Sequence, residues 1–400
     1  MHPFFLSTTS PLAPSDRYAN PYHGTEVLRF AEVTVDDYER YCAALETAGF
    51  TLYCRRILAQ NQFATYTTPL FSAHLAFYPA LGEMRVTHGA HTYLPPLEAK
   101  QAEHVQSHTF TQIKLSNIGQ SDIVQLSDGS FLIIDGGVDN EDDRACLLSF
   151  LLTKKPKHHP KPRIAAWLIS HAHNDHIHLC QEFLKAYADR VEIELFGYNF
   201  PDFTGDIAVF VKEGQQGRTI RWQNQMRDIV NQHFPLAKRW EPHSGQALHL
   251  PGCDVDVLIA FEDYWPCEMS GVNPSSCCFR LRFESGKTAM LPTDAWFGSC
   301  DQMALVYGDE LKSDILQAVH HGTAGGTLPF YERVAPEVVL WEYPVTPPSV
   351  KPTDAKLHLE FFDVVRNKYP YSAWLLDHAT RHYHSGETVT LDTETLELLS

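Results

Sequence analysis

The spacing of apolar and polar positions in the first hundred residues predicts a small domain with one helix and several strands. Thr34 can cap a helix over residues 35–48, since Asp37 occupies the capping-box position and Gly49 follows as a C-terminal stop. Strand-like runs surround this helix and read EVLRFAEV, FTLYCRRI, FATYTT, AHLAFYP and EMRVTH. We therefore expect an α+β unit in which one helix covers a mainly antiparallel sheet.

The pattern changes after a proline-containing linker near residues 93–104. Short apolar strands now alternate with helices, one capped by Asn140 and another ending near residue 189. Hairpin-like pairs follow, QALHL with DVDVLIA and CCFRLRF with TAMLP. The chain finishes with strands at DILQAVHHG, EVVLWEY and SAWLLDH, separated by helices at PFYERVA and HLEFFDVVRNKY. This order indicates sheets covered by helices, so we expect an α/β domain over residues 106–400 and an accessory domain with its linker over residues 1–105.

Composition and charge limit the class of protein. The 400 residues suit one large domain plus a smaller one, and 44% hydrophobic with 20% charged residues is typical of an ordinary folded chain. The formal net charge of −17 would repel a phosphate backbone, and prolines mark the basic cluster KKPKHHPKPR as a loop. We therefore expect a small-molecule substrate and no long nucleic-acid partner.

The cysteines and the first residues favour a cytoplasmic protein. Nine cysteines, an odd number that includes the adjacent pair Cys277 and Cys278 but no C-x-x-C motif, fit reduced buried thiols better than a disulfide framework. The N-terminal stretch lacks the basic segment and the apolar run of a signal peptide or membrane span. We expect no membrane partner.

One short stretch, LISHAHNDHIHL, concentrates side chains that can bind metal. On an extended loop, residues two apart face the same side, so His171 and His173 can chelate one ion while Asp175 and His176 turn toward a second. Imidazole with carboxylate suits zinc above all, with manganese or iron as alternatives. His178 is interpreted as a helix-face histidine without a metal role.

The motif H-x-H-x-D-H after an apolar strand resembles the metallo-β-lactamase superfamily over roughly residues 106–400. The resemblance implies a four-layer αβ/βα sandwich with a two-metal cleft at one edge of the sheets. Asp135 in LIIDGG matches the early strand-end aspartate, which contacts the ligands rather than the metals. Asp294 in AMLPTDAW matches the aspartate that bridges both ions. His320 in LQAVHHG matches the final histidine ligand, and His321 stands beside it.

The resemblance is nearest to the branch of competence-protein hydrolase domains and phosphorylcholine esterases, in which Asn273 and Ser276 would lie near the cleft. One piece is missing. The superfamily usually supplies another histidine to the first metal from the region before the bridging aspartate, and the candidates there are His233, His243 and His249, with His243 in EPHSG preferred. Alternatively, water or another group completes the first metal site. Three tail histidines have spacings that could bind metal or could be exposed turn residues: His378, His382 and His384.

The resemblance implies a hydrolase that uses a metal-bound hydroxide. Asp175 would hold one of two zinc ions and orient the hydroxide, Asp294 would bridge, and His321 could donate a proton or stabilise an oxyanion. A small phosphodiester is the first choice of substrate, and a lactone, lactam or thioester is the second. A non-catalytic metal-binding scaffold is the third interpretation. The N-terminal domain is expected to serve packing or homo-oligomerisation, with a lid as the alternative.

Overall fold

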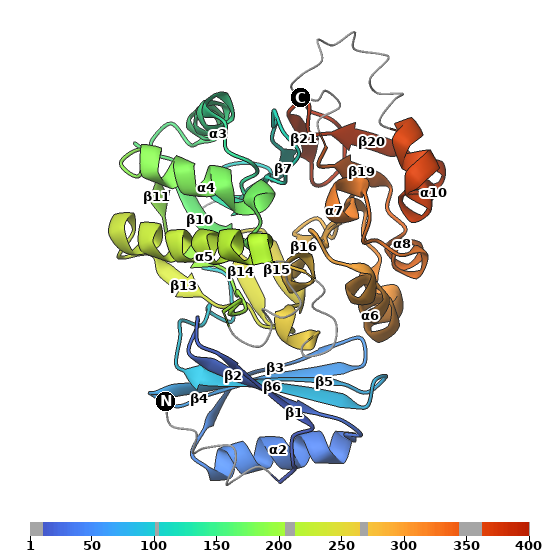
Figure 1. Ribbon diagram of the computed structural model, residues 1–400. Helices are drawn as coiled ribbons and strands as arrows, with labels where there is room; N and C mark the ends of the chain where they lie inside the picture. The colour runs from blue at the N-terminus through green and yellow to red at the C-terminus, as the bar shows by residue number, and fades with distance from the viewer. Residues whose placement is uncertain (1–10, 101–103, 205–212, 265–270, 344–361, 400) are drawn as a thin grey trace.

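The computed structural model describes residues 11–100, 104–204, 213–264, 271–343 and 362–399. Its first sheet is six-stranded and antiparallel. In spatial order the strands are β1 (Asp16–Asn20), β2 (Thr25–Phe30), β6 (Glu83–Ala90), β5 (Phe71–Tyr78), β4 (Asn61–Thr67) and β3 (Thr51–Leu58). The helix α2 (Val35–Thr47) covers one face (Figure 1), and its predicted capping box between Thr34 and Asp37 is confirmed.

Two larger mixed sheets face each other in the rest of the chain. The eight-stranded sheet runs in the order β13 (Lys238–Trp240), β12 (Leu195–Gly197), β10 (Arg163–Leu168), β9 (Phe131–Ile134), β8 (Asp122–Gln125), β7 (Thr109–Gln112) and β21 (Val389–Asp392), with β11 (Glu192–Ile193) paired to β10. The seven-stranded sheet runs in the order β14 (Ala247–Leu250), β15 (Cys253–Ile259), β16 (Cys278–Phe283), β17 (Thr288–Leu291), β18 (Ile315–Gln317), β19 (Val338–Trp341) and β20 (Arg381–His384). Both predicted hairpin pairs are confirmed as β14 with β15 and β16 with β17.

Helices cover the outer faces of these two sheets. Apolar side chains from the inner faces form one continuous core, to which Leu168 and Phe279 both belong. The helices α3 (Glu141–Lys154), α4 (Asn174–Tyr187) and α5 (Glu213–His233) lie on one side, and α6 (Phe297–Tyr307), α8 (Leu328–Val334) and α10 (Pro370–His378) lie on the other (Figure 1). Because each sheet buries one face against the other and one against helices, the predicted four-layer αβ/βα sandwich is confirmed.

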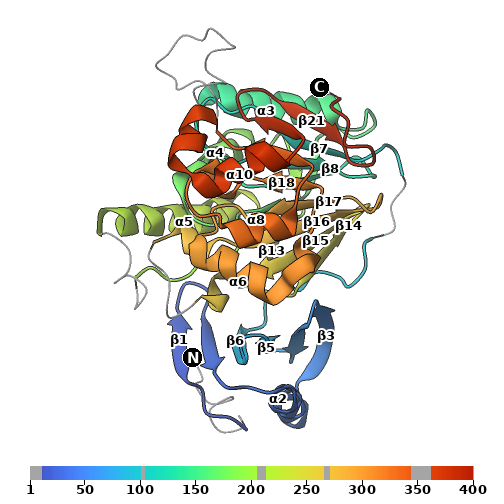
Figure 2. The same ribbon diagram turned by 90° about the vertical axis from the view of Figure 1, so that its right-hand side faces the viewer.

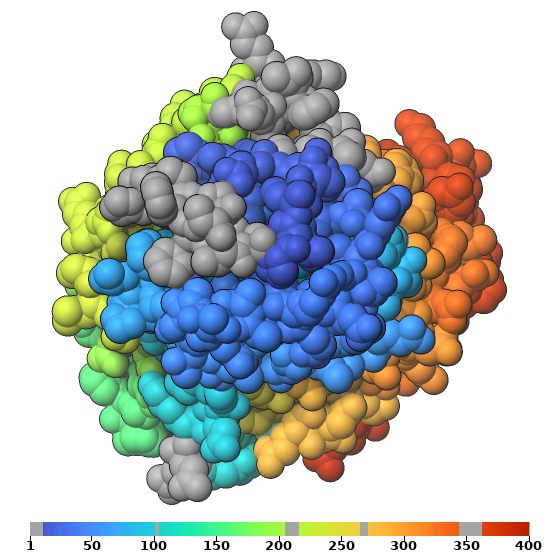
Figure 3. Space-filling view, turned by 90° about the horizontal axis from the view of Figure 1, so that it is seen from below, coloured from blue at the N-terminus to red at the C-terminus, as the bar shows by residue number. Residues whose placement is uncertain are grey.

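The N-terminal sheet lies across one end of the sandwich (Figure 2), and Figure 3 shows how much of that end it covers. Buried polar contacts join the two parts. Arg56 lies 2.6 Å from the Asp256 carboxylate, and the Tyr78 hydroxyl donates to Asp263 at 2.7 Å. Arg85 donates to the backbone carbonyl of Glu262 at 3.2 Å. Since unmade buried contacts of this kind are costly, the first sheet is attached firmly, and the predicted boundary at residue 105 stays a prediction about independent folding.

Two sequence-based assignments need correction. The run SAWLLDH, predicted as a strand, belongs to α10, and the strand follows it as β20. Pro370 at the start of α10 supplies a preset helical φ, and a short apolar run alone does not distinguish a buried strand from a buried helix. The helix α5 was not predicted, because its sequence is mostly polar. Part of the helix predicted at HLEFFDVVRNKY lies outside the described residues, and residues 362–368 are helical.

The described cysteines and helices bear on the predicted cellular setting. Cys277 and Cys278 are fully buried, and every cysteine in the described ranges has a free thiol. The prediction of unpaired thiols is therefore confirmed for those cysteines. Across the same ranges, no helix combines the length and the apolar character needed to cross a bilayer.

Candidate metal centre

The ends of parallel strands bring the predicted site residues to one edge of the two facing sheets. In the first sheet β9 and β10 are parallel neighbours, and Asp135 and the histidine-rich loop follow their carboxyl ends. In the second sheet β17 and β18 are parallel neighbours, followed by Asp294 and by the pair His320 and His321. Because both sheets end their strands at the same edge, loops far apart in the sequence meet there.

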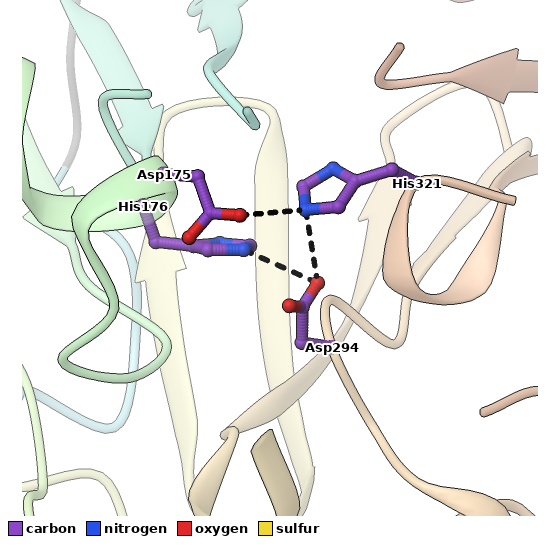
Figure 4. A group of neighbouring side chains, drawn as sticks. All are labelled: Asp175, His176, Asp294 and His321. Atoms are coloured by element: carbon purple, nitrogen blue, oxygen red, sulfur yellow. Dashed lines mark ion pairs between the residues drawn. The ribbon is translucent and has the colours of Figure 1, made fainter. Parts of the chain in front are cut away.

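Asp294 lies at the centre of this edge, with histidines on both sides of its buried carboxylate. Its Oδ1 is 3.1 Å from His176 Nε2 and 3.4 Å from His321 Nε2. Its Oδ2 is 3.7 Å from His171 Nε2 and 3.6 Å from His320 Nε2. Figure 4 shows His176 approaching the carboxylate from the left and His321 approaching it from above. Each carboxylate oxygen therefore faces two imidazole nitrogens.

Two groups of side chains have the spacing of metal ligands, and Asp294 belongs to both. One group contains Asp175, His176, Asp294 and His321, whose candidate donor atoms lie within 4.8 Å of one another. The other contains His171 and His173 with Asp294 under the same limit. Nitrogen with carboxylate donors suits a transition-metal dication such as zinc.

Orphaned polar atoms support a metal in this position. Both carboxylate oxygens of Asp294, Nε2 of His176 and both ring nitrogens of His321 are buried without a hydrogen bond in the part of the chain that the structure describes. A buried polar atom without a partner costs about 1–3 kcal/mol, so a cluster of them is unfavourable unless a ligand satisfies it. Two dications at this edge would satisfy all of these atoms except His321 Nδ1, because it is Nε2 of that ring that faces Asp175 and Asp294. The residues present therefore fit a dinuclear centre.

Oxygen atoms hold the far side of three histidine rings. His171 Nδ1 lies 3.0 Å from the Ser170 hydroxyl, and His176 Nδ1 lies 2.8 Å from Asp135 Oδ2. His320 Nδ1 lies 2.9 Å from the carbonyl of Ala324. Metal-binding histidines usually donate their second ring N–H in this way, which fixes the tautomer and the ring orientation. In all three rings Nε2 is the atom that faces Asp294.

Asp135 supports the ligands and belongs to neither group. Its Oδ1 accepts from the Ser170 amide at 2.7 Å, and its Oδ2 accepts from the Ser170 hydroxyl at 2.7 Å. The same carboxylate contacts His176 Nδ1. Asp135 therefore orients one ligand directly and the loop that begins the histidine-rich stretch through Ser170.

The charges around Asp294 determine the protonation of the centre. Burial disfavours the charged carboxylate, but the facing histidines outweigh it and hold the pKa of Asp294 well below its ordinary value. Burial keeps the pKa of His171 well below its ordinary value and also lowers the pKa of His173, so both rings are neutral, the form that binds metal. Burial also favours the neutral form of His176, but the carboxylates of Asp294 and Asp135 outweigh it and raise the pKa of His176 well above its ordinary value.

Backbone conformation places the two adjacent histidines. His320 (φ 49°, ψ 51°) and His321 (φ 59°, ψ 20°) are both left-handed, as are Asp135 (φ 60°) and Thr293 (φ 52°). A non-glycine residue in this region costs about 1–3 kcal/mol, and such residues cluster at functional sites. The turn is completed by Gly322, where a Cβ atom would lie 2.2 Å from the Trp341 ring. The strain is therefore concentrated on the loops that hold the candidate ligands.

The structure places the other candidate histidines away from the centre. His243 Nδ1 lies 2.8 Å from Glu262, and its ring stacks on His74 at 3.9 Å, at the contact with the N-terminal sheet. This position gives no support to His243 as a metal ligand. His249 contacts Asp254 instead. Among the residues described, the remaining candidates also lie outside both groups: His233, His378, His382 and His384. The predicted ligand His320 is in neither group, although its Nε2 faces Asp294 at 3.6 Å.

Four further residues line the centre or lie behind it. Asn273 Nδ2 lies 3.1 Å from His320 Nε2, which places Asn273 beside the centre, and the Trp296 ring lies edge-on to His320 at 5.4 Å. Two buried carboxyls behind the centre, Asp122 and Glu342, were missed by the sequence analysis. The signal for Glu342 was available, because it directly follows the apolar strand VVLW. Asp122 starts a strand and carried no such signal.

Comparisons with known proteins give similarity in fold at low identity. No protein-family model matches the sequence, and no curated protein does. The chain is similar to the metallo-β-lactamase fold protein YhfI from Bacillus subtilis, with 14% identity and a TM-score of 0.40 over 71% of this chain and 99% of that one. It is similar to CmlA, a diiron β-hydroxylase from Streptomyces venezuelae, with 12% identity and a TM-score of 0.42 over 72% of this chain and 54% of that one.

A third similarity is to the short form of human tRNase Z, with 10% identity and a TM-score of 0.32 over 57% of this chain and 91% of that one. One of these proteins is named a hydroxylase and another a tRNase. The similarities therefore do not indicate which reaction this chain performs, and the resemblance to the competence-protein branch stays a prediction.

Proposed function

We propose that this chain is a dinuclear metal-dependent hydrolase that acts on a small phosphodiester. The observation that carries the proposal is the Asp294 carboxylate, whose two oxygens each face two histidine Nε2 atoms at 3.1–3.7 Å. A carboxylate in this position can give one oxygen to each of two ions. Zinc is the proposed metal, two ions per chain, with manganese or iron as alternatives.

Two bound zinc ions would supply Lewis acidity and would lower the pKa of a water toward 7. The chain supplies the positioning. Asp175 lies at the N-terminus of α4, where its carboxylate is 3.4 Å from His321 Nε2 and can accept a hydrogen bond from the attacking water. Burial opposes ionisation of Asp175, but the His321 ring and the nearby His176 hold its pKa below the ordinary value, so the base is charged near neutral pH.

His321 acts as a ligand in this proposal, in place of the predicted proton donor. Its Nε2 faces both Asp175 and Asp294, and the ring is almost fully buried. A nitrogen that binds a metal has no proton to donate. Asp175 therefore remains the candidate for moving a proton.

The choice of a small phosphodiester is supported by charge and by motif. The net charge of −17 disfavours long nucleic acids, and the HHG sequence resembles that of phosphoryl-ester hydrolases. Nothing in the ligand set itself selects phosphorus over carbon. A lactone, lactam or thioester is therefore the alternative substrate class.

A panel of chromogenic substrates tests the proposal. The zinc-loaded protein should hydrolyse phosphodiesters before phosphomonoesters, lactones, lactams and thioesters, and the chelated protein should hydrolyse none. If the protein opened a lactone or lactam but left phosphodiesters intact, the proposed substrate class would be wrong and the assignment as a hydrolase would stand. Turnover that survives complete metal removal would refute the proposed function.

The N-terminal domain is proposed to stabilise the catalytic domain rather than to act on substrate. Its described contacts with the sandwich include hydrogen bonds, ion pairs and apolar packing of Phe63 and Tyr78, and the candidate metal ligands all lie beyond residue 105. Homo-oligomerisation through this domain and a cytoplasmic location stay predictions.

A further inference from the structure

We infer that His320 supplies the missing nitrogen to the first metal, so that the adjacent residues His320 and His321 serve different ions. This inference rests on the proposed dinuclear centre. It departs from the resemblance used above, in which that nitrogen comes from a histidine that precedes the bridging aspartate. In this chain the preferred candidate from that region, His243, lies against Glu262 and His74 instead.

The first support is the division of histidines between the two oxygens of Asp294. Oδ1 faces His176 and His321, and both belong to the group that contains Asp175. Oδ2 faces His171 and His320. Since a bridging carboxylate gives one oxygen to each ion, His320 lies on the same side as His171 and its neighbour His173.

The second support is the tautomer of His320. Its Nδ1 lies 2.9 Å from the Ala324 carbonyl, which can only accept a hydrogen bond, so Nδ1 carries the proton. Nε2 then presents a lone pair toward Asp294 at 3.6 Å. His171 and His176 have the same arrangement, with an oxygen at Nδ1 and Nε2 toward Asp294. The ring of His320 is therefore prepared for a metal in the same way as two predicted ligands.

The third support is the strained turn. His320 and His321 are both left-handed, and both rings turn toward the Asp294 carboxylate, with their centroids 5.7 Å apart. A strained backbone of this kind is typical of residues held in place for a function. The His320 amide donates at 2.8 Å to the carbonyl of Thr293, the residue before Asp294, which fixes the turn to the bridging side chain.

Asn273 holds the ring until a metal binds. Its Nδ2 lies 3.1 Å from His320 Nε2, and its Oδ1 is buried without a partner among the described residues. Metal binding at Nε2 would replace this hydrogen bond. The His320 side chain is 25% exposed, whereas those of His171 and His321 are at most 1% exposed. His320 is therefore more accessible to solvent than either of those two histidines.

The experiment compares His320→Asn with His321→Asn and with the control His178→Ala. Asparagine tolerates the left-handed conformation better than alanine, so the loop can keep its shape. Zinc affinity is measured with a competing chelator, and cobalt replaces zinc for absorption spectra. His320→Asn should lower the affinity for one ion by at least about tenfold, leave the affinity for the other ion unchanged and alter the cobalt absorption bands. His321→Asn should lower the affinity for the other ion, and His178→Ala should change neither affinity.

The alternative role for His320 is contact with substrate. In that case His320→Asn would keep two ions with unchanged affinity and unchanged cobalt bands while turnover falls, and the inference would be overturned. A variant that is folded by circular dichroism but loses both ions equally would overturn it too. If the unmodified protein binds no metal, the proposed function itself fails, which is a separate outcome.

Discussion

Asp294 is the side chain on which both halves of the candidate centre depend. Asp294→Ala removes the negative charge between two dications and exposes their mutual repulsion, so at least one ion should be lost and turnover should fall by at least about 100-fold. Metal stoichiometry by elemental analysis and turnover of the best substrate measure this. His178→Ala, which alters a histidine whose ring lies tilted against Trp222, is the control and should change neither. An Asp294→Ala protein with two ions and normal turnover would remove the dinuclear mechanism.

Asp135 tests whether a residue that orients the ligands, but binds no metal itself, affects zinc affinity. Asp135→Asn keeps the size of the side chain but turns one acceptor oxygen into a donor, so the hydrogen bonds from Ser170 and His176 cannot all be kept. Zinc affinity should fall by about 10–100-fold although no ligand is removed. Asp143→Asn is the control, because Asp143 is also buried and accepts two hydrogen bonds from Ser116 away from the centre. Equal affinity in the two variants would contradict the proposed role of Asp135.

A pair of buried carboxyl side chains lies behind the candidate metal centre, at the ends of two strands. Asp122 begins β8 and Glu342 follows β19, and both side chains are almost fully buried. Gln120 Nε2 donates to Asp122 Oδ2 at 2.9 Å. Burial raises the pKa of Asp122 to about 7, and burial beside Asp122 raises the pKa of Glu342 well above its ordinary value. The folded protein therefore keeps protons on this pair that the unfolded chain releases.

This pair predicts a pH dependence of stability. The unfolded Asp122 ionises near pH 4, whereas the folded residue ionises at a pKa of about 7, so the folded state binds more protons in that window. The contribution of this pair to the free energy of unfolding should therefore fall as the pH rises from about 4 to 7, by up to about 1.4 kcal/mol per pH unit for each acid, and should go on falling above pH 7 until Glu342 ionises. Urea unfolding at several pH values measures the slope. Asp122→Asn should make the slope between pH 4 and 7 less negative than in the unmodified protein, and an unchanged slope in that variant would exclude Asp122 as a source of it.

The two domains make a prediction about truncation. Removal of residues 1–104 leaves every candidate ligand in place, so the remaining chain should still bind two ions. It loses the contacts of Arg56 with Asp256 and of Tyr78 with Asp263, and it exposes the apolar surface of the sandwich that Phe63 covers, so the melting temperature should fall by several degrees or more. Calorimetry and elemental analysis measure both. A truncated chain that folds but holds no metal would show that the N-terminal domain contributes to the centre.

Patterns between neighbouring residues were sufficient for the outline of this protein. The capping box at Thr34 and Asp37 and the mixture of strands with helices predicted a small α+β unit followed by sheets covered by helices. The four-layer sandwich and the place of the candidate site were implied by the resemblance that H-x-H-x-D-H carries. Periodicity and spacing are properties of a local stretch of sequence, so they can be read without knowing which residues that stretch contacts in the folded protein. Where the local signal was ambiguous, as in SAWLLDH, or weak, as in the polar helix α5, the prediction failed or was not made.

The arrangement inside the site depended on residues that meet only after folding. The sequence could not show that the two oxygens of Asp294 divide the histidines, or that left-handed backbone turns both His320 and His321 toward it. It also could not show that His243 contacts the N-terminal sheet, or that Asp122 meets another buried acid from a distant strand. Distances, burial and pKa shifts of this kind arise from elements brought together across two sheets, and spacing along the chain carries no record of them.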